Sequence, residues 1–234
     1  MRTILFVAIL SVFVWAIFGN VKSADAQEIS VSDAEGISSI DQAALQEELA
    51  YPVNSVLSIE EEQGLIYLRE EEKLAHDVYV SLYQTWGLNI FQNIANSEAT
   101  HTAAIKTLLD RYGISDPVGS NPVGVFTNPD LQALYTRLVA DGSKSLVDAL
   151  KVGAAIEELD IKDLQTHLAE TDNLEIELVY ENLMRGSQNH LRAFTSTLER
   201  QTGVSSQPQQ GTYGRTPCFI QRTRALGKVK NSNF

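Results

Sequence analysis

Four stretches of about 23 to 30 residues carry apolar side chains at spacings of three and four, which is the period of one face of an α-helix. In the first stretch, Leu65, Leu68, Ala75 and Tyr79 fall on one such face. The sequence contains no run of alternating β-branched residues, the pattern that predicts a half-buried strand. We therefore expect an all-α fold, with long helices over about residues 58–85, 89–112, 143–170 and 172–203.

The signals that begin and end these helices also indicate how they are connected. Ser58 and Glu61 form a capping-box pattern at the start of the first helix, and Gly113 marks the end of the second. Short loops within each pair of helices require antiparallel neighbours. About 30 residues separate the two pairs, and they include a short helix over residues 129–140 with Pro129 at its first position. The sequence therefore predicts a four-helix bundle with one long crossover connection that carries a short helix.

The first 26 residues have the order of features of a secretory signal peptide. Arg2 supplies a positive charge, residues 4–18 are almost entirely apolar, and Ala24 and Ala26 are small residues where a signal peptidase reads them. The alternative is an N-terminal membrane anchor, but this apolar run of about 15 residues is shorter than the ~20 that span a bilayer as a helix. We expect cleavage after residue 26, a secreted or periplasmic protein, and no stable membrane insertion of the mature chain.

The predicted bundle, residues 58–203, lies between two polar segments. Residues 27–57 form a polar leader with a short helix over residues 41–49. Residues 204–234 are rich in Gly, Ser and Gln and contain basic residues but no acid, which predicts a disordered basic tail. Cys218, the single cysteine, lies in this tail. The fold therefore needs no intramolecular disulfide, and Cys218 is a free thiol, an intermolecular link or an incidental residue.

The net charge of −12 limits the partners of the protein. The tail is basic, so the part of the chain before it is more acidic than the total indicates. An acidic domain repels phosphates, which argues against nucleic acid as a partner. Acidity is compatible with binding metal ions, and a homodimer stays open on the sequence alone.

Each long helix also places polar side chains on a face that is otherwise apolar. Buried carboxylates are unfavourable unless they are paired or bound to a cation, so several at one level of a bundle favour a metal site. Oxygen and imidazole donors suit iron or manganese. Glu70 and Glu71 are interpreted as a solvated charge run. The candidate metal ligands, in chain order, are Glu72, Glu98, His101, Glu157, Asp160 and His190.

The order and spacing of these residues resemble the four helix motifs of rubrerythrin and other ferritin-like di-iron proteins. The motifs are Glu72 with Ala75 and Tyr79, Glu98 with His101 and Ile105, Glu157 with Asp160, and Ser187 with His190 and Phe194. More closely, residues 65–201 are similar to the bacterial and archaeal ferritin-like family catalogued as domain of unknown function 2202. Residues 156–161 and 189–194 carry that similarity. The resemblance implies a ferritin-like fold and a di-iron or manganese centre.

The resemblance also implies a role for each candidate ligand. The di-iron pattern has one glutamate from each of two helices and a Glu-x-x-His step from each of the other two. Glu72 and Glu157 are then single-carboxylate ligands, and Glu98 with His101 is a complete step. The fourth helix departs from the pattern, because Ser187 stands where the motif has glutamate. Either Asp160 supplies the missing carboxylate, or the second metal position is weak or empty.

Two functions are consistent with these observations. The first is an exported ferritin-like metal-binding protein, specifically a di-iron or manganese oxidoreductase with ferroxidase or peroxide-consuming activity. The second is a non-catalytic helical bundle that acts as an interaction or structural module and has lost a complete metal site. In the second case the polar residues pair among themselves, for example Glu98 or Glu157 with a protonated His190.

Overall fold

The computed structural model of the protein describes residues 28–33, 36–53 and 55–203. The predicted signal peptide, the predicted basic tail and Cys218 lie outside these residues. The described part of the chain contains six helices and two short strands, so the predicted all-α class is confirmed apart from those strands. None of the helices described is long and apolar enough to cross a membrane.

The four predicted long helices are present, and so is the short helix between the pairs. The long helices are α2 (Ile59–Trp86), α3 (Asn89–Tyr112), α5 (Leu146–Leu168) and α6 (Leu174–Thr202), and the short helix is α4 (Pro129–Gly142). The capping box at the start of α2 forms as predicted, because Glu61 N–H donates to Ser58 Oγ at 3.1 Å and Ser58 N–H donates to Glu61 Oε2 at 2.8 Å. Gly113, with φ of 68°, ends α3 in the left-handed conformation that favours glycine.

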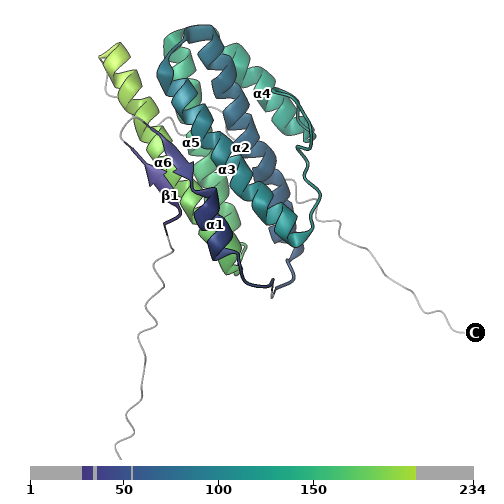
Figure 1. Cartoon of the computed structure of the whole chain (residues 1–234). Helices are drawn as coiled ribbons and strands as arrows, with labels where there is room; N and C mark the ends of the chain where they lie inside the picture. The colour runs from purple at the N-terminus through teal and green to yellow at the C-terminus, as the bar shows by residue number, and fades with distance from the viewer. Residues whose placement is uncertain (1–27, 34–35, 54, 204–234) are drawn as a thin grey trace, which may run out of the picture.

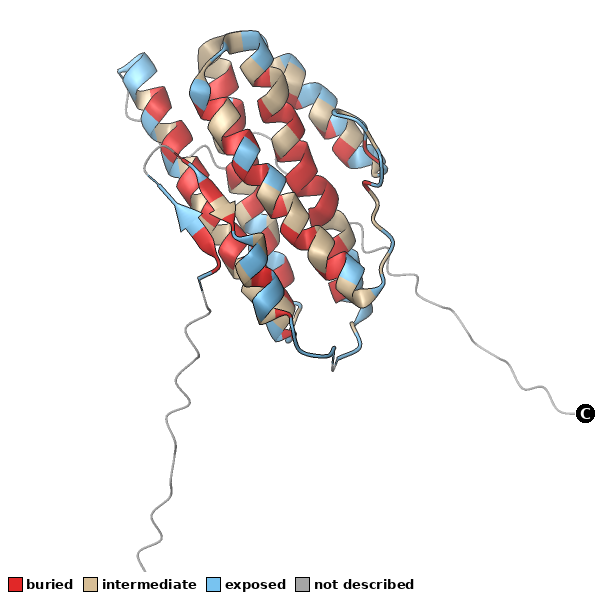
Figure 2. Ribbon diagram, in the orientation of Figure 1, coloured by how far each residue is buried: buried red, intermediate tan, exposed pale blue. Residues whose placement is uncertain are grey.

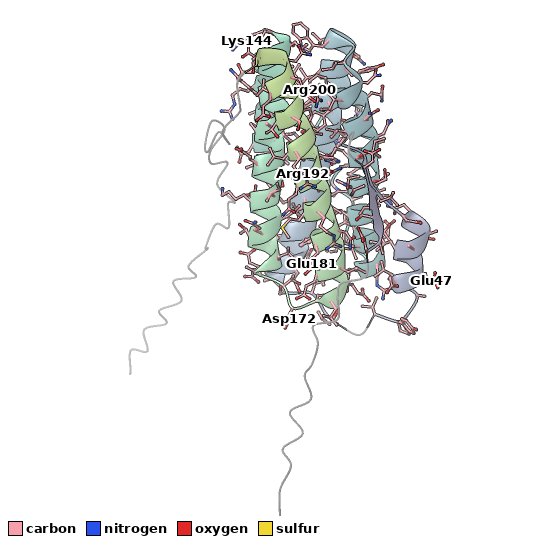
Figure 3. All side chains as sticks on the ribbon, turned by 90° about the vertical axis from the view of Figure 1, so that its left-hand side faces the viewer. Glu47, Lys144, Asp172, Glu181, Arg192 and Arg200 are labelled. Atoms are coloured by element: carbon pink, nitrogen blue, oxygen red, sulfur yellow. The ribbon has the colours of Figure 1, made fainter. Side chains whose placement is uncertain are left out.

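The long helices pack side by side in two antiparallel pairs, α2 with α3 and α5 with α6 (Figure 1). The pairs meet where α2 contacts α5 and α3 contacts α6, while α4 lies outside against α2 and α5. Trp86 at the end of α2 donates from Nε1 to the carbonyl of Gly142 at 2.9 Å. Helices α3 and α5 begin just after these two residues, so they start at the same end and run in the same direction. Figure 3 places Lys144 near one end and Asp172 at the other, so α5 runs the length of the bundle.

The leader is more structured than the sequence indicates. Its predicted short helix is confirmed as α1 (Gln42–Glu48), capped by Asp41. The prediction that the chain contains no sheet was wrong, because β1 (Ser30–Ser32) pairs antiparallel with β2 (Ser38–Ile40). These strands are only three residues long, too short to show a periodic pattern, and contacts of β2 with α3 and α6 hold the hairpin in place.

The interior of the bundle contains two apolar clusters separated along the helix axes. One cluster includes Tyr79, Phe91 and Phe194, and the other includes Leu65 and Leu183. Figure 2 shows buried residues running along the inner faces of the long helices between both ends. The region between the clusters is therefore also buried, and its residues are polar.

Candidate metal centre

Each long helix passes from one apolar cluster to the other through a stretch that contains buried polar residues. On α2, for example, Glu72 lies between Leu68 of one cluster and Leu74 of the other. The same change occurs on α3 between Ala95 and Ala104. Because the four helices run side by side, these polar residues share one level of the bundle. They are Glu72 of α2, Glu98 and His101 of α3, Glu157 and Asp160 of α5, and Ser187 and His190 of α6.

The carboxylate of Glu98 lies between two imidazole rings. Its Oε2 is 2.9 Å from Nδ1 of His101, and its Oε1 is 2.7 Å from Nδ1 of His190. The rings are stacked with their centroids 5.4 Å apart. One ligand atom of each of the three residues lies within 4.8 Å of the other two. These three residues form a group of buried ligand atoms that could hold a metal ion.

Two further glutamates flank this group, one beside each histidine. Glu72 Oε2 is 3.4 Å from Nδ1 of His101, and Glu157 Oε2 is 3.4 Å from Nδ1 of His190. None of these side chains is more than 1% exposed. Each histidine therefore faces Glu98 and one other glutamate.

Asp160 reaches the same level through a contact with Ser187. The Ser187 hydroxyl donates to Oδ2 of Asp160, and the Asp160 side chain is buried. Burial, together with the charges of Glu72 and Glu157, raises the pKa of Asp160 well above its ordinary value. Of the six candidate ligands, Glu98, His101 and His190 form one group of ligand atoms, Glu72 and Glu157 lie beside its histidines, and Asp160 contacts Ser187. The contact joins a carboxyl group of α5 to the hydroxyl of Ser187 on α6.

Several buried polar atoms of this group have no hydrogen bond of acceptable geometry. Glu98 Oε1 and His190 Nδ1 are close together, yet their alignment does not satisfy a hydrogen bond. Native cores leave few polar atoms in this condition, and each such atom calls for an explanation. Among the described residues the unpartnered atoms at this level are Oε1 and Oε2 of Glu72, Oε1 of Glu98, Oε2 of Glu157, Oδ1 of Asp160, and Nδ1 and Nε2 of His190.

The electrostatics of the centre concentrate charge on Glu98 and the two imidazoles. Burial acts to raise the pKa of Glu98, but His190 and His101 outweigh it and hold that pKa below its ordinary value. Burial acts to lower the pKa of His190, whereas the carboxylates of Glu98 and Glu157 raise it to about 9. The pKa of His101 is raised well above its ordinary value, chiefly by Glu98 against the effect of burial. For Glu72, burial and the Glu98 charge raise the pKa to about 8.

Two contacts with this centre come from residues that the sequence did not assign to it. Tyr79, on the same face of α2 as Glu72, donates its hydroxyl to Glu157 Oε1 at 2.5 Å. His101 Nε2 lies 2.7 Å from the backbone carbonyl of Ser38 in β2. The helical spacing of Tyr79 pointed to this face, but no sequence signal identifies a backbone carbonyl in the leader.

The interpretation of Glu70 and Glu71 as a solvated charge run was wrong. Glu70 is 2% exposed, and its carboxylate accepts from the backbone N–H groups of Thr127 and Asn128 at 2.5 and 2.9 Å. Glu71 is 3% exposed, and the Tyr67 hydroxyl donates to its Oε1 at 3.3 Å. Glu70 therefore anchors the long connection to α2, while Glu71 adds a further carboxyl group beside the centre.

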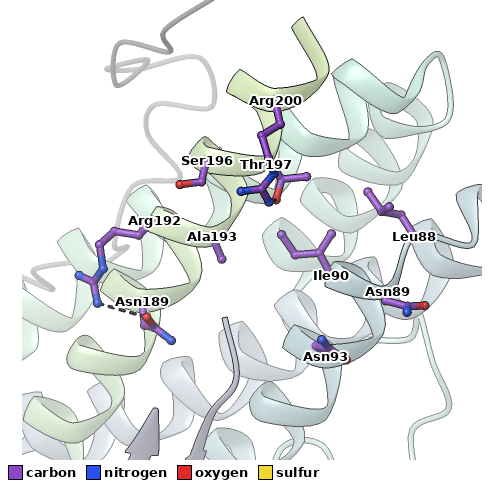
Figure 4. A pocket seen from close by; sticks show the side chains of 10 residues that line it. All are labelled: Leu88, Asn89, Ile90, Asn93, Asn189, Arg192, Ala193, Ser196, Thr197 and Arg200. Atoms are coloured by element: carbon purple, nitrogen blue, oxygen red, sulfur yellow. Dashed lines mark hydrogen bonds between the residues drawn. The ribbon is translucent and has the colours of Figure 1, made fainter. Parts of the chain in front are cut away.

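A separate pocket of about 460 Å³ opens on the surface between the start of α3 and the end of α6 (Figure 4). Its lining includes Asn93, Asn189 and Arg200, and none of the six candidate ligands. The candidate metal centre is therefore an interior site, distinct from this pocket.

Comparison with known proteins identifies the family of the chain. The model of the family described as "Uncharacterized protein domain (DUF2202)" matches residues 61–212, more than half of the chain. Uncharacterized protein MJ0754 of Methanocaldococcus jannaschii is 58% identical over 142 residues, which cover 61% of this chain and 77% of that protein. The crystal structure of hypothetical protein MJ0754 from the same archaeon has a TM-score of 0.66 at 54% identity, covering 68% of this chain and 90% of that chain. The chain therefore belongs to the family of uncharacterized protein domains DUF2202, as its sequence predicted.

Proposed function

We propose that this protein is an exported, ferritin-like metal-binding protein that holds one or two iron or manganese ions. The ligands are Glu72, Glu98, His101, Glu157, Asp160 and His190. The single long crossover connection, with α3 and α5 running in the same direction, supports the ferritin-like assignment. The proposal of export rests on the signal-peptide features of the first 26 residues.

The observation that carries the proposal is the set of unpartnered buried atoms at the level of Glu98. Leaving one buried polar group without a partner costs about 1–3 kcal/mol, and more for a charged group. Seven such atoms of five ligands lie between the two apolar clusters. A bound cation would supply a missing partner to carboxylate oxygens and to one of the two ring nitrogens of His190. The donors are oxygen and nitrogen without sulfur, which favours iron or manganese over softer metals.

The protein's own residues have distinct roles in such a centre. Glu98, which directs one oxygen toward each histidine, would hold the metal together with both imidazoles. Tyr79 orients Glu157, and Ser187 orients Asp160. Metal binding displaces protons from the ligands, because a ligand atom must offer a lone pair. When bound, iron or manganese supplies redox chemistry, and on this basis we assign a ferroxidase or peroxide-consuming activity.

One observation favours the alternative of a structural module without metal. Protonated His101 and His190 are already paired with the single carboxylate of Glu98, at 2.9 and 2.7 Å. Such a buried group of charges is viable when every member is well hydrogen-bonded. His190 does not meet this condition, because neither of its ring nitrogens has a hydrogen-bond partner within the described residues. We therefore favour the metal-binding function.

Titration of the metal-free protein with Mn²⁺ and, without oxygen, with Fe²⁺ tests the proposal. We expect one or two equivalents to bind and the thermal midpoint to rise, since a ligand at 100 times its dissociation constant stabilises the folded state by about 2.7 kcal/mol. Glu98→Gln removes the shared carboxylate and should abolish binding. Glu181→Gln is the matched control on α6, because Glu181 is an exposed carboxylate whose side chain is 40% exposed. Its binding should equal that of the wild type.

The two functions give opposite results in this titration. Wild-type protein that binds neither ion and shows no change in thermal midpoint refutes the metal-binding function and supports the structural module. Equal binding by wild type and Glu98→Gln would place the metal elsewhere and refute the assigned ligands.

A further inference from the structure

The described part of the leader nearest the metal centre is a strap, residues 38–49, made of β2 and α1. The strap crosses the line where α3 and α6 meet, because β2 contacts both helices and α1 contacts α3. Figure 4 shows the hairpin strands (purple) below the surface pocket that opens between the same two helices. Ser38, Ile40 and Leu45 of the strap are at most 3% exposed. The strap is therefore part of the folded interior rather than a loose leader.

Two side chains of α3 hold the backbone of the strap in register. Ser38 N–H donates to Ser97 Oγ at 2.9 Å, and Ile40 N–H donates to Thr100 Oγ1 at 2.9 Å. Both hydroxyls lie next to ligands in the chain, Ser97 before Glu98 and Thr100 before His101. The same turn of α3 therefore carries the ligands on its inner face and the anchors of the strap beside them.

The anchored backbone presents the Ser38 carbonyl to His101. The 2.7 Å contact requires that Nε2 of His101 carries the hydrogen, since a carbonyl oxygen only accepts. Nδ1 of the same ring then faces Glu98 at 2.9 Å and Glu72 at 3.4 Å. A hydrogen bond to the second nitrogen of a metal-binding histidine fixes the orientation of the ring and the nitrogen that binds. Here the acceptor comes from outside the bundle.

Gly186 of α6 makes this contact possible. A Cβ atom at position 186 would lie 2.6 Å from Cε1 and 2.8 Å from Nε2 of His101, and 3.1 Å from Oγ of Ser38. Any side chain there would displace the imidazole or the strap. The absence of a side chain at Gly186 leaves the space in which the ring and the strap meet.

We propose that the strap is a positioning element of the metal centre, in which the Ser38 carbonyl holds the imidazole of His101 with Nδ1 toward the metal. This inference rests on the metal-binding function proposed above. The family match begins at residue 61, after the strap. The positioning group is therefore supplied by a segment outside the matched family domain.

The anchors allow a test in the full chain that leaves every ligand intact. In the Ser97→Ala/Thr100→Val double variant both anchoring hydroxyls are lost. Thr100→Ser keeps the Thr100 hydroxyl and is the conservative control. Outer partners of metal ligands typically contribute 10–100-fold to metal affinity. We expect the dissociation constant for Mn²⁺ to rise about tenfold or more in the double variant and to stay at the wild-type value in Thr100→Ser.

Two further measurements separate positioning from general destabilisation. Ser58→Ala removes the cap of α2 and neither of the two anchoring hydroxyls, so it weakens the fold but should leave the Mn²⁺ affinity unchanged. In the metal-free protein, ¹⁵N-edited NMR should detect the His101 Nε2–H as a slowly exchanging proton that exchanges faster in the double variant. If the double variant does not fold, the same two measurements are compared between the single variants Thr100→Val, which loses the hydroxyl, and Thr100→Ser, which keeps it.

The outcomes distinguish this inference from the metal-binding proposal. Wild-type protein that does not bind Mn²⁺ refutes the metal-binding function, while the Nε2–H exchange still decides whether the strap holds His101. Unchanged Mn²⁺ affinity together with unchanged Nε2–H exchange in the double variant overturns the strap's role. A loss of affinity that Ser58→Ala reproduces overturns it as well, because the effect would then follow stability alone.

Discussion

Raising the pH from 7 to 8 should destabilise the metal-free protein, because two buried groups of the metal centre keep their protons in the folded state. Burial and the Glu98 charge raise the pKa of Glu72 from 4.5 to about 8. The pKa of His190 rises from 6.5 to about 9, since Glu98 and Glu157 outweigh the opposing effect of burial. The unfolded chain, with ordinary values for both groups, has largely released both protons by pH 7.

The sign and size of the effect follow from this difference in bound protons. Where the folded state binds more protons than the unfolded state, the free energy of unfolding falls as the pH rises. For Glu72 the fall extends from pH 4.5 to about 8, and for His190 from 6.5 to about 9. A fully retained proton contributes about 1.4 kcal/mol per pH unit. Because Glu72 loses about half of its proton by pH 8, the two groups together give about 2 kcal/mol between pH 7 and 8. The raised pKa of Asp160 also makes the free energy of unfolding fall as the pH rises.

Urea unfolding of the full chain in the presence of a chelator, at half-unit steps from pH 6.5 to 8.5, measures this slope. Glu72→Gln is the control, because it removes one titrating group and should reduce the fall between pH 7 and 8 by about 1 kcal/mol. Glu98, whose pKa is held low, is ionised in both states over this range and does not contribute. A free energy of unfolding that is constant or rises between pH 7 and 8 would show that the two groups do not keep their protons, and would refute the electrostatic description of the centre.

Two other substitutions test how the centre and its surroundings are packed. In Gly153→Ala the new Cβ would lie 2.6 Å from the Phe194 ring. Such overpacking should lower the free energy of unfolding, measured in urea, by about 1–3 kcal/mol. An unchanged urea midpoint would mean that the Phe194 ring moves freely. Tyr79→Phe leaves buried Glu157 without its phenol donor, which should cost about 1–3 kcal/mol in the metal-free protein. Calorimetry measures this loss, and equal stability of the two proteins would contradict the hydrogen bond.

The helices could be predicted from the sequence because their signals are local. The helical period fixes which face of α2 carries Leu65, Leu68 and Glu72, whatever the rest of the chain does. Caps such as Ser58 and Gly113 involve only nearby residues, so they mark helix ends reliably. The same periodicity placed one or more buried polar residues on each long helix, and this was enough to name the six candidate ligands.

The strap and the buried acids of α2 could not be predicted because their partners are distant in the chain. Strand β2 is held by side-chain hydroxyls of α3, about 60 residues away in the chain. No sequence pattern within residues 38–40 indicates that contact. Glu70 binds backbone N–H groups of the long connection, about as far from it in sequence. A run of three glutamates is typical of a solvated face, whereas here the long connection binds Glu70 and Tyr67 donates to Glu71.

Ser187 shows the same limit within the site itself. Considered along α6 alone, a serine in a glutamate position is a lost ligand, and the sequence left open whether the second metal position is empty. Across the interface of α5 and α6, however, the serine hydroxyl is a donor that holds the carboxyl group of Asp160. The number of carboxyl groups at this level therefore depends on the pair of helices together, which no single helix motif can express.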